Sequence, residues 1–186
     1  MPNHTIVALV QDKPGVLNRV ASMFRRRGYN ISSLTVGHSE MADLSRMTFV
    51  VEGDDATVEQ VTKQLYKLID VVRVLEMSED EIVAREMALI KVRATAQTRS
   101  EIIQIVDIFR ANIIDVSPDS LIIEVTGDED KIDSLYELLK TFSVRELMRT
   151  GRVAMTRGAG ATGQDNGRTS SNDARAQRPR NHESIL

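Results

Sequence analysis

The stretch Asp12-Lys13-Pro14-Gly15-Val16-Leu17, followed one helix later by Gly28-Tyr29-Asn30-Ile31, organises the first half of this sequence. Pro14-Gly15 is typical of a tight turn, because proline restricts its own φ and glycine accepts positive φ. An apolar-periodic segment follows at once, so we expect a helix to begin there. Its first amides would lack intrahelical partners and could hold a carboxylate, while Asp12 could face an ammonium group. Those are the two ends of a free amino acid, although Pro-Gly taken alone is more often a plain turn.

Composition excludes several classes of protein. The chain has 186 residues, 41% hydrophobic and 27% charged, which is enough for one domain or two small ones. Its formal net charge of -3 argues against nucleic acid as a partner, because such binding relies on clustered Lys and Arg. The absence of cysteine excludes disulfides and thiolate sites. No apolar run approaches the roughly 18 residues of a membrane span and no signal sequence is visible, so we expect a cytoplasmic protein without a membrane partner.

Apolar periodicity divides the first unit into strands and helices. Strands are predicted over residues 4–10, 30–36, 46–51 and 71–75, with a polar connection over 37–45. A first helix is predicted over 16–24, ending where Arg25-Arg26-Arg27 precede Gly28. A second helix is predicted after Gly53-Asp54. The apolar face of that second helix is predicted to consist of Val58, Val61, Leu65, Leu68 and Ile69.

The order β-α-β-β-α-β indicates a ferredoxin-like unit, an antiparallel sheet with both helices on one side. Helices can cover only one face of such a sheet, yet Val7 and Leu9 are apolar on the other face of the first strand. A unit of about 75 residues is marginal by itself. We therefore expect a partner surface to complete it, and a homodimer is the simplest solution.

The same pattern recurs in the second part of the chain. Strands are predicted over 87–94, 113–116, 121–125 and 144–155, and helices over 102–109 and 131–142. The second helices of the two units align at one constant offset, each after a Gly-Asp pair, which indicates a degenerate repeat. The predicted fold class is α+β, with two tandem ferredoxin-like βαββαβ units over 1–78 and 79–157. Residues 158–186 have few apolar side chains, so we expect a disordered tail.

Three further patterns carry no predicted site. Gly158-Ala159-Gly160-Ala161-Thr162-Gly163 matches a dinucleotide fingerprint, but no helical periodicity follows it. The acidic run Glu79-Asp80-Glu81 and Glu86 lack the spacing of cation ligands and indicate a solvated linker or a lead-in strand. His4, His38 and His182 lie in different elements without ligand spacing. We predict no catalytic residue, no bound cofactor and no metal site.

Asn30 is the second half of the predicted amino-acid site. In a ferredoxin-like unit, the turn at Pro14-Gly15 and the start of the following strand lie at opposite ends of the first helix. A turn therefore cannot easily reach Asn30 of its own chain. The Asn30 of a second copy could reach it, which would place the ligand at a dimer interface.

At Asp12-Lys-Pro-Gly-Val-Leu the sequence resembles the ACT domain, an amino-acid-sensing ferredoxin-like module with the motif Asp-x-Pro-Gly-x-Leu. A narrower resemblance, covering about residues 4 to 157, is to the regulatory small subunits of acetohydroxyacid synthase, also called acetolactate synthase. The motifs that carry it are Arg26-Arg27-Gly28-Tyr29-Asn30-Ile31, Leu34-Thr35-Val36, Ser45-Arg46-Met47-Thr48, Gln64-Leu65-Tyr66-Lys67-Leu68 and Ile113-Ile114-Asp115-Val116.

This resemblance implies a subunit that is not itself an enzyme. It would activate the catalytic large subunit, its partner, and make it sensitive to feedback inhibition by valine or another branched-chain amino acid. Thiamine diphosphate, FAD and Mg²⁺ would belong to the large subunit. The effector-binding residues implied by position are Asp12, Lys13, Pro14, Gly15, Val16 and Leu17 from one copy and Asn30 and Ile31 from the dimer partner. Among these, Val16, Leu17 and Ile31 could shape an apolar pocket for the effector side chain.

The second unit departs from the motif, because its corresponding loop, residues 96–100, has no Pro-Gly. We therefore do not expect it to bind an amino acid, although Asn112-Ile113 repeats Asn30-Ile31. Two alternatives from other classes remain. An acylphosphatase-like enzyme would need an arginine in the first turn, which has none. An RNA-binding module would need exposed aromatic residues on the central strands, and the first strand has none.

Overall fold

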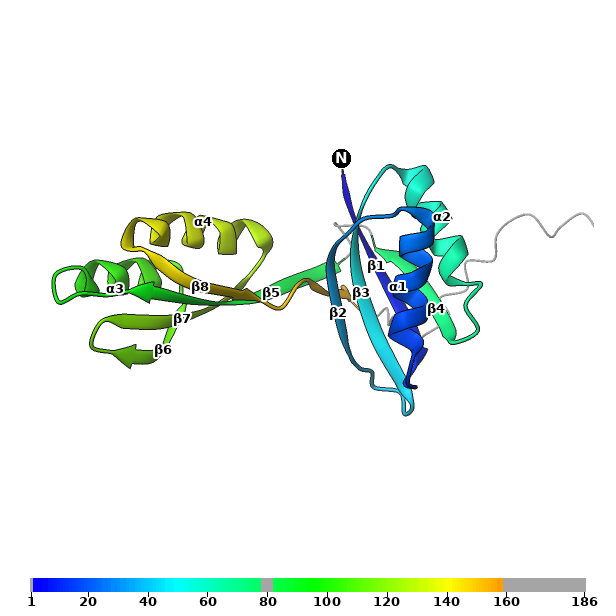
Figure 1. Cartoon of the computed structure of the whole chain (residues 1–186), viewed down its shortest axis with the longest axis horizontal. Coiled ribbons are helices and arrows are strands. Elements are labelled where there is room, and N and C mark those ends of the chain that lie inside the picture. The colour runs from blue at the N-terminus through cyan, green and yellow to red at the C-terminus, as the bar shows by residue number, and fades with distance from the viewer. Residues whose placement is uncertain (1, 78–81, 159–186) are drawn as a thin grey trace, which may run out of the picture.

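The computed structural model describes residues 2–77 and 82–158 (Figure 1). The elements of the first unit are β1 Asn3–Gln11, α1 Val16–Arg27, β2 Ile31–His38, β3 Leu44–Glu52, α2 Asp55–Leu65 and β4 Val71–Met77. The sheet order is β2-β3-β1-β4 with antiparallel neighbours, and both helices lie on one face. On that face Phe49 is fully buried and stacks on Phe24, with ring centroids 5.3 Å apart.

The second unit repeats this arrangement. Its elements are β5 Ile82–Arg93, α3 Arg99–Ile108, β6 Asn112–Ser117, β7 Ser120–Gly127, α4 Glu129–Leu139, a 3₁₀ turn Lys140–Phe142, β8 Val144–Arg149 and β9 Val153–Thr156. The order β6-β7-β5-β8 repeats that of the first sheet, and β9 pairs with β5. The predicted α+β class with two βαββαβ units is confirmed.

Two Gly-Asp pairs explain where the second helix of each unit begins. Asp54 accepts a hydrogen bond from the Thr57 amide at 2.8 Å, and Asp128 accepts one from the Lys131 amide at 2.9 Å. Such N-caps satisfy amides that the helix itself leaves without partners. Hydrogen bonds from the side chain and the amide of Thr57 lower the pKa of Asp54 below its usual value. The alignment of the two units seen in the sequence therefore reflects a shared capping geometry.

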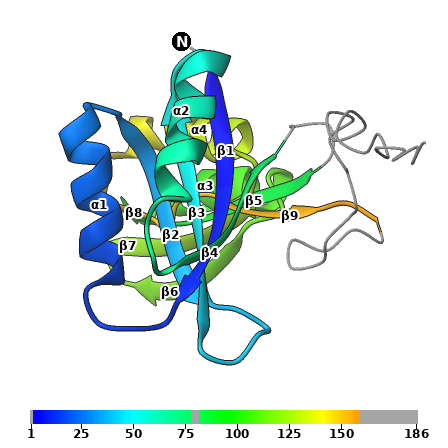
Figure 2. The same ribbon diagram turned by 90° about the vertical axis from the view of Figure 1, so that its right-hand side faces the viewer.

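The prediction of one continuous last strand was wrong. Residues 144–155 form two strands, β8 and β9, because the strand is interrupted at residues 150–152, where Gly151 has a φ of 88°. Both strands run antiparallel to β5. β8 pairs with residues 88–92 of β5, whereas β9 pairs with residues 82–85. β5 is accordingly 12 residues long and begins at Ile82, before the predicted start at Met87. Figure 2 shows β9 running beside this first part of β5.

The predicted apolar face of the second helix was wrong at its end. The helix stops at Leu65, and the chain turns through hydrogen bonds from Leu68 N to Leu65 O and from Val71 N to Leu68 O. Leu68 still packs against the core, but Ile69 is 91% exposed. The fourth helix likewise ends at Leu139 and continues only as a 3₁₀ turn. The connection between β2 and β3 is shorter than predicted, because both strands extend into it.

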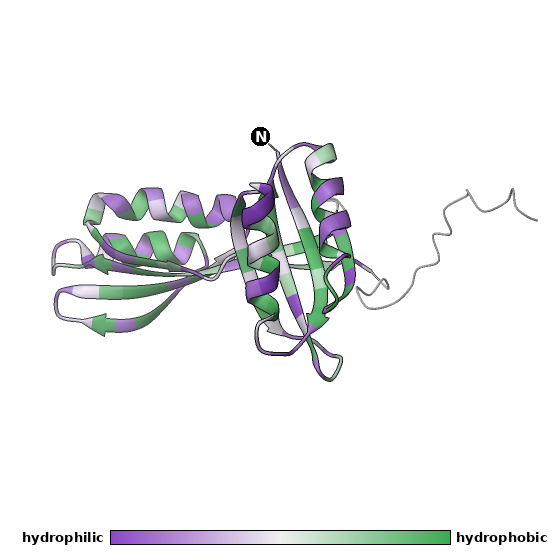
Figure 3. Ribbon diagram, turned by 45° about the vertical axis from the view of Figure 1, so that its right-hand side comes forward, coloured by the Kyte–Doolittle hydropathy of each residue, from purple (hydrophilic) through white to green (hydrophobic). Residues whose placement is uncertain are grey.

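The face of the first sheet that carries no helix is buried in part by the second unit. Val7 packs with Met77, Ile82 and Ala154 in a separate apolar cluster, and Val7 and Leu9 are nearly inaccessible. The partner surface expected from the sequence is thus supplied in part by the same chain. Figure 3 shows the hydrophobic residues along the central strands of this sheet, while its helices alternate in hydropathy. No helix in the described ranges is long and apolar enough to cross a membrane.

Leu65 and Ile69 provide a matched test of the end of α2. We expect Leu65→Ala to lower the free energy of unfolding by about 2–5 kcal/mol, because it opens a cavity in the core. Ile69→Ala should change it by less than about 0.5 kcal/mol, since the side chain is exposed. Urea unfolding followed by circular dichroism measures both. A large loss in Ile69→Ala would contradict the observed end of the helix.

Candidate functional site

The turn before α1 leaves the start of this helix open. Gly15 is the N-cap, with φ 85°, and no side chain caps the helix. A side chain at this position would be strained, because L-residues rarely adopt this conformation. Arg19 N donates to Gly15 O at 3.0 Å and so closes the first helical turn. The positive end of α1 therefore faces outward at a position without a side chain.

Contacts with two distant segments, and one between α1 and the second of these segments, hold the turn in place. The amide of Asp12 donates to Asp43 O at 2.8 Å, and the amide of Gln11 donates to Asp70 O at 2.8 Å. Arg19 Nε donates to Asp70 Oδ2 at 2.6 Å, and the Asp70 side chain is only 12% exposed. The turn is thus tied to the β2–β3 connection, to the start of β4 and to α1.

Asp12 already has a histidine neighbour in this structure. Its Oδ2 lies 3.0 Å from Nδ1 of His38, at the end of β2, and both side chains are substantially exposed. An exposed pair of this kind is weak, so an ammonium group could compete for the same carboxylate. Sequence reasoning did not identify His38, Asp43, Arg19 or Asp70 as part of this site. Only Arg19 gave a signal, because it lies one helical turn after Gly15.

The predicted site residues differ in how accessible they are. Lys13, Pro14 and Gly15 are exposed, and Leu17 is 46% exposed. Val16 is buried in the core of the first unit, so its side chain does not face a ligand at the surface. Ile31 is partly buried and packs against the same core, whereas Asn30 is exposed.

The two predicted halves of the site lie at opposite ends of the first sheet (Figure 1). Gln11 pairs with Leu44 at the start of β3, and Ile31 pairs with Val51 near its end. Leu44 and Val51 are seven residue steps apart along β3, which corresponds to about 23 Å. Within one chain the turn and Asn30 therefore form no common pocket, as expected from the topology.

The corresponding turn of the second unit lacks both the carboxylate and the glycine of the first. Ala94 stands in the place of Asp12, since its amide donates to Asp119 O at 2.9 Å in the β6–β7 turn. Thr98 replaces Gly15 and has a negative φ. The Arg99 side chain donates to Ser117 O at 2.7 Å, and Asn112 Nδ2 donates to Glu124 Oε1 at 3.3 Å. This turn is therefore occupied by contacts within its own unit.

The other candidate patterns show no assembled site in the described residues. Arg25, Arg26 and Arg27 form the last turn of α1, before Gly28 in the left-handed conformation. Glu86 is buried and paired with Arg149. Residues 79–81 of the acidic run, residues 159–163 of the glycine pattern and the predicted disorder over 159–186 lie outside the described ranges. Within those ranges no three potential metal ligands come together.

Comparison with known proteins gives the family of both units. Residues 6–73 match the small subunit-like ACT domain of AHAS, and residues 85–158 match the small subunit of acetolactate synthase. A probable acetolactate synthase small subunit from Archaeoglobus fulgidus is 59% identical over 155 residues, 83% of this chain and 97% of that protein. An acetolactate synthase small subunit from Mycolicibacterium smegmatis is 53% identical over 157 residues, 84% of this chain and 92% of that one.

A solved structure supports the same assignment. The acetolactate synthase small subunit from Thermotoga maritima superposes with a TM-score of 0.82 and is 49% identical, covering 86% of this chain and all of that chain. The agreement therefore extends over both βαββαβ units. The chain belongs to the acetolactate synthase small subunit family, and its first unit is an ACT domain.

Proposed function

We propose that this chain is a cytoplasmic, non-catalytic regulatory subunit that activates an acetolactate synthase catalytic subunit and makes it sensitive to valine or another branched-chain amino acid. The observation that carries this proposal is the open N-terminus of α1 at Gly15, beside the carboxylate of Asp12, in a chain of this family. Residues 1–78 would bind the effector. Thiamine diphosphate, FAD and Mg²⁺ would reside in the catalytic subunit.

The geometry of the turn suits both charged ends of an amino acid. The effector carboxylate would bind the first amides of α1, where the helix dipole favours negative charge. The ammonium group would bind Asp12 in competition with His38. Leu17 and the partly buried Ile31 would contact the apolar side chain of the effector. Valine has about eight heavy atoms, so binding in the micromolar to millimolar range is reasonable.

A homodimer would complete the site. β2 is the edge strand of the first sheet, and Asn30 precedes it at the end remote from the turn. Pairing of two copies would bring the Asn30 of one to the turn of the other. Effector binding and subunit association would then be one coupled equilibrium. A coupling of about 1–3 kcal/mol to the catalytic subunit would be sufficient for feedback control.

The alternative functions find less support in the geometry. An acylphosphatase-like site needs a free arginine at the turn, but Arg19 is held by Asp70. An RNA-binding sheet needs exposed aromatic residues, but Phe49 on the central strand β3 is fully buried.

Gly15→Asp is expected to abolish valine binding, measured by isothermal titration calorimetry. The variant places a negative charge and a strained residue where the effector carboxylate would bind. Gly158→Asp is the matched control, because Gly158 also has a positive φ, 74°, with open space around it. Unchanged valine binding in Gly15→Asp would exclude the proposed site.

Mixing two defective variants tests whether the site is shared between copies. Gly15→Asp and Asn30→Ala should each bind valine poorly alone. After unfolding and refolding together, mixed dimers would contain one intact site each, so about a quarter of all sites should bind valine. No recovery of binding would indicate that each site lies within one chain.

Reconstitution with the catalytic subunit tests the proposed function as a whole. The two chains should co-purify, and this chain should raise acetolactate formation by the catalytic subunit. Added valine should then reduce the activity of the complex but not that of the catalytic subunit alone. A complex without activation and without valine inhibition would overturn the proposal.

A further inference from the structure

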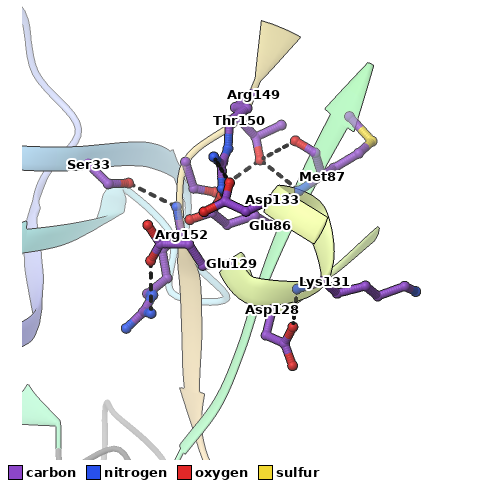
Figure 4. Close-up of polar contacts among 11 residues, drawn as sticks. Ser33, Glu86, Met87, Asp128, Glu129, Lys131, Asp133, Arg149, Thr150 and Arg152 are labelled. Atoms are coloured by element: carbon purple, nitrogen blue, oxygen red, sulfur yellow. Dashed lines mark hydrogen bonds and ion pairs between the residues drawn. The ribbon is translucent and has the colours of Figure 1, made fainter. Parts of the chain in front are cut away.

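The segment Thr150-Gly151-Arg152, here called the strap, joins β8 to β9 and crosses the edge strand of the ACT domain. The amide of Arg152 donates to Ser33 Oγ at 2.9 Å, as Figure 4 shows, and Thr35 Oγ1 donates to Arg152 O at 2.7 Å. Both acceptor and donor side chains come from β2. The strap is therefore bonded to β2 through both polar groups of the Arg152 backbone.

The close approach of the strap to β2 depends on Gly151. A Cβ at this position would lie 2.7 Å from Ser33 Oγ, and φ is 88°. Both conditions favour glycine, because a side chain would collide with β2 and strain the backbone. The glycine between β8 and β9 thus permits the strap to lie close against the ACT domain.

The Arg152 side chain extends the same contact to both units. Its Nη1 donates to Thr5 Oγ1 of β1 at 3.0 Å, and its Nη2 lies 3.6 Å from Glu129 Oε2 at the start of α4 (Figure 4). The side chain is only 14% exposed, and Thr5 is fully buried. A guanidinium held between a buried hydroxyl and a carboxylate positions the two units relative to one another.

The other end of the strap is anchored in the second unit. Thr150 N donates to Met87 O at 3.0 Å, and Met87 N donates to Thr150 Oγ1 at 3.1 Å. Arg149 donates twice to the buried Glu86, at 2.7 and 3.1 Å, and once to Asp133 of α4 at 2.7 Å. Burial lowers the pKa of Arg149, but the hydrogen bonds to Glu86 and Asp133 outweigh it and raise the pKa. The strap is therefore bonded to the second unit as well as to β2.

On the first unit, the strap is bonded to β2, the strand that begins at Ile31, directly after Asn30. The pairing of β2 with β3 shifts between Ile31 and Ser33, so the start of β2 is an irregular part of the ladder. Such bulges allow local adjustment of a strand without breaking the rest of the sheet. Any displacement of Asn30 and Ile31 on effector binding would reach Ser33 within two residues.

We infer that the strap transmits effector occupancy from the start of β2 to the second unit, with Ser33, Thr35 and Arg152 as positioning residues for regulation. This inference rests on the proposed function, because it assumes that Asn30 and Ile31 contact the effector. It assigns a role to residues outside the effector site. Loss of the strap contacts should separate effector binding from its effect on the catalytic subunit.

The double variant Ser33→Ala/Thr35→Val removes both hydrogen bonds between β2 and the strap with little change in side-chain volume. Ser32→Ala is the matched control, because Ser32 Oγ donates to Val50 O and Glu52 Oε1 within the ACT domain. Glu129→Gln, which removes one charge facing Arg152 on the surface of α4, is a second variant that leaves β2 intact.

The complex with the catalytic subunit and the small subunit alone are measured with valine. In the double variant, the calorimetric Kd for valine should stay within about threefold of wild type and activation should be retained, while inhibition at saturating valine is largely lost. Glu129→Gln should weaken inhibition in the same direction, and Ser32→Ala should behave as wild type. Such results would show that the strap transmits effector occupancy. A general loss of protein stability would instead weaken valine binding and inhibition together.

Two outcomes would overturn the inference. Wild-type inhibition in the double variant would show that the strap does not transmit occupancy. A parallel loss of valine binding and inhibition would show that the strap only maintains the site. If wild-type protein itself neither binds valine nor inhibits the complex, the proposed function fails first and this inference with it.

Discussion

The structure depends on a constraint of the split βαββαβ unit: its two helices cover one face of the sheet and leave the other to find a partner. In the ACT domain this second face is apolar at its centre, where Val7 and Leu9 are nearly inaccessible. Ile82 at the start of β5 and Ala154 of β9 pack against Val7, together with Met77 of β4. Burial of apolar surface contributes about 25 cal/mol per Å², so this contact adds to the stability supplied by the helix-covered core.

In this arrangement, residues of the second unit complete the apolar packing of the first sheet. β5 is a single strand whose first residues pair with β9 against the ACT sheet and whose later residues form the centre of the second sheet. The part of β5 that packs against the ACT sheet is therefore continuous with the centre of the second sheet. The strap adds a second connection at the edge strand β2. Two connections at different strands constrain rotation of the units more strongly than one linker would.

Much of the fold could be predicted from the sequence because burial within each element follows a local period. Val58, Val61 and Leu65 recur at helical spacing, and the Gly-Asp caps give the starts of α2 and α4. The errors arose where the structure of a segment does not follow from its own apolar pattern. Ile69 continues the apolar pattern past the helix end, and Glu86 belongs to an acidic run but is buried through its pairing with Arg149. Gly151 interrupts the last predicted strand at the point where Ser33 of the first unit lies against it.

The candidate site was predictable only in its local part. The turn at Gly15 has a sequence signature, because positive φ and an uncapped helix start require particular residues. His38, Asp43 and Asp70 reach the turn from other strands, so no local pattern could indicate them. The separation of Asn30 from the turn followed from topology alone. What the sequence lacked was the set of long-range contacts that hold the turn open.

The two units show how one fold can retain or lose a binding turn without a change in topology. The backbone bond from Asp12 to Asp43 has its counterpart in the bond from Ala94 to Asp119. The frame is therefore conserved between the repeats, while the carboxylate and the left-handed glycine are present only in the first. In the second, Arg99 donates to the carbonyls of Ser117 and Pro118 and closes the turn. The same frame thus carries an uncapped helix start in the first unit and a turn filled by an arginine side chain in the second.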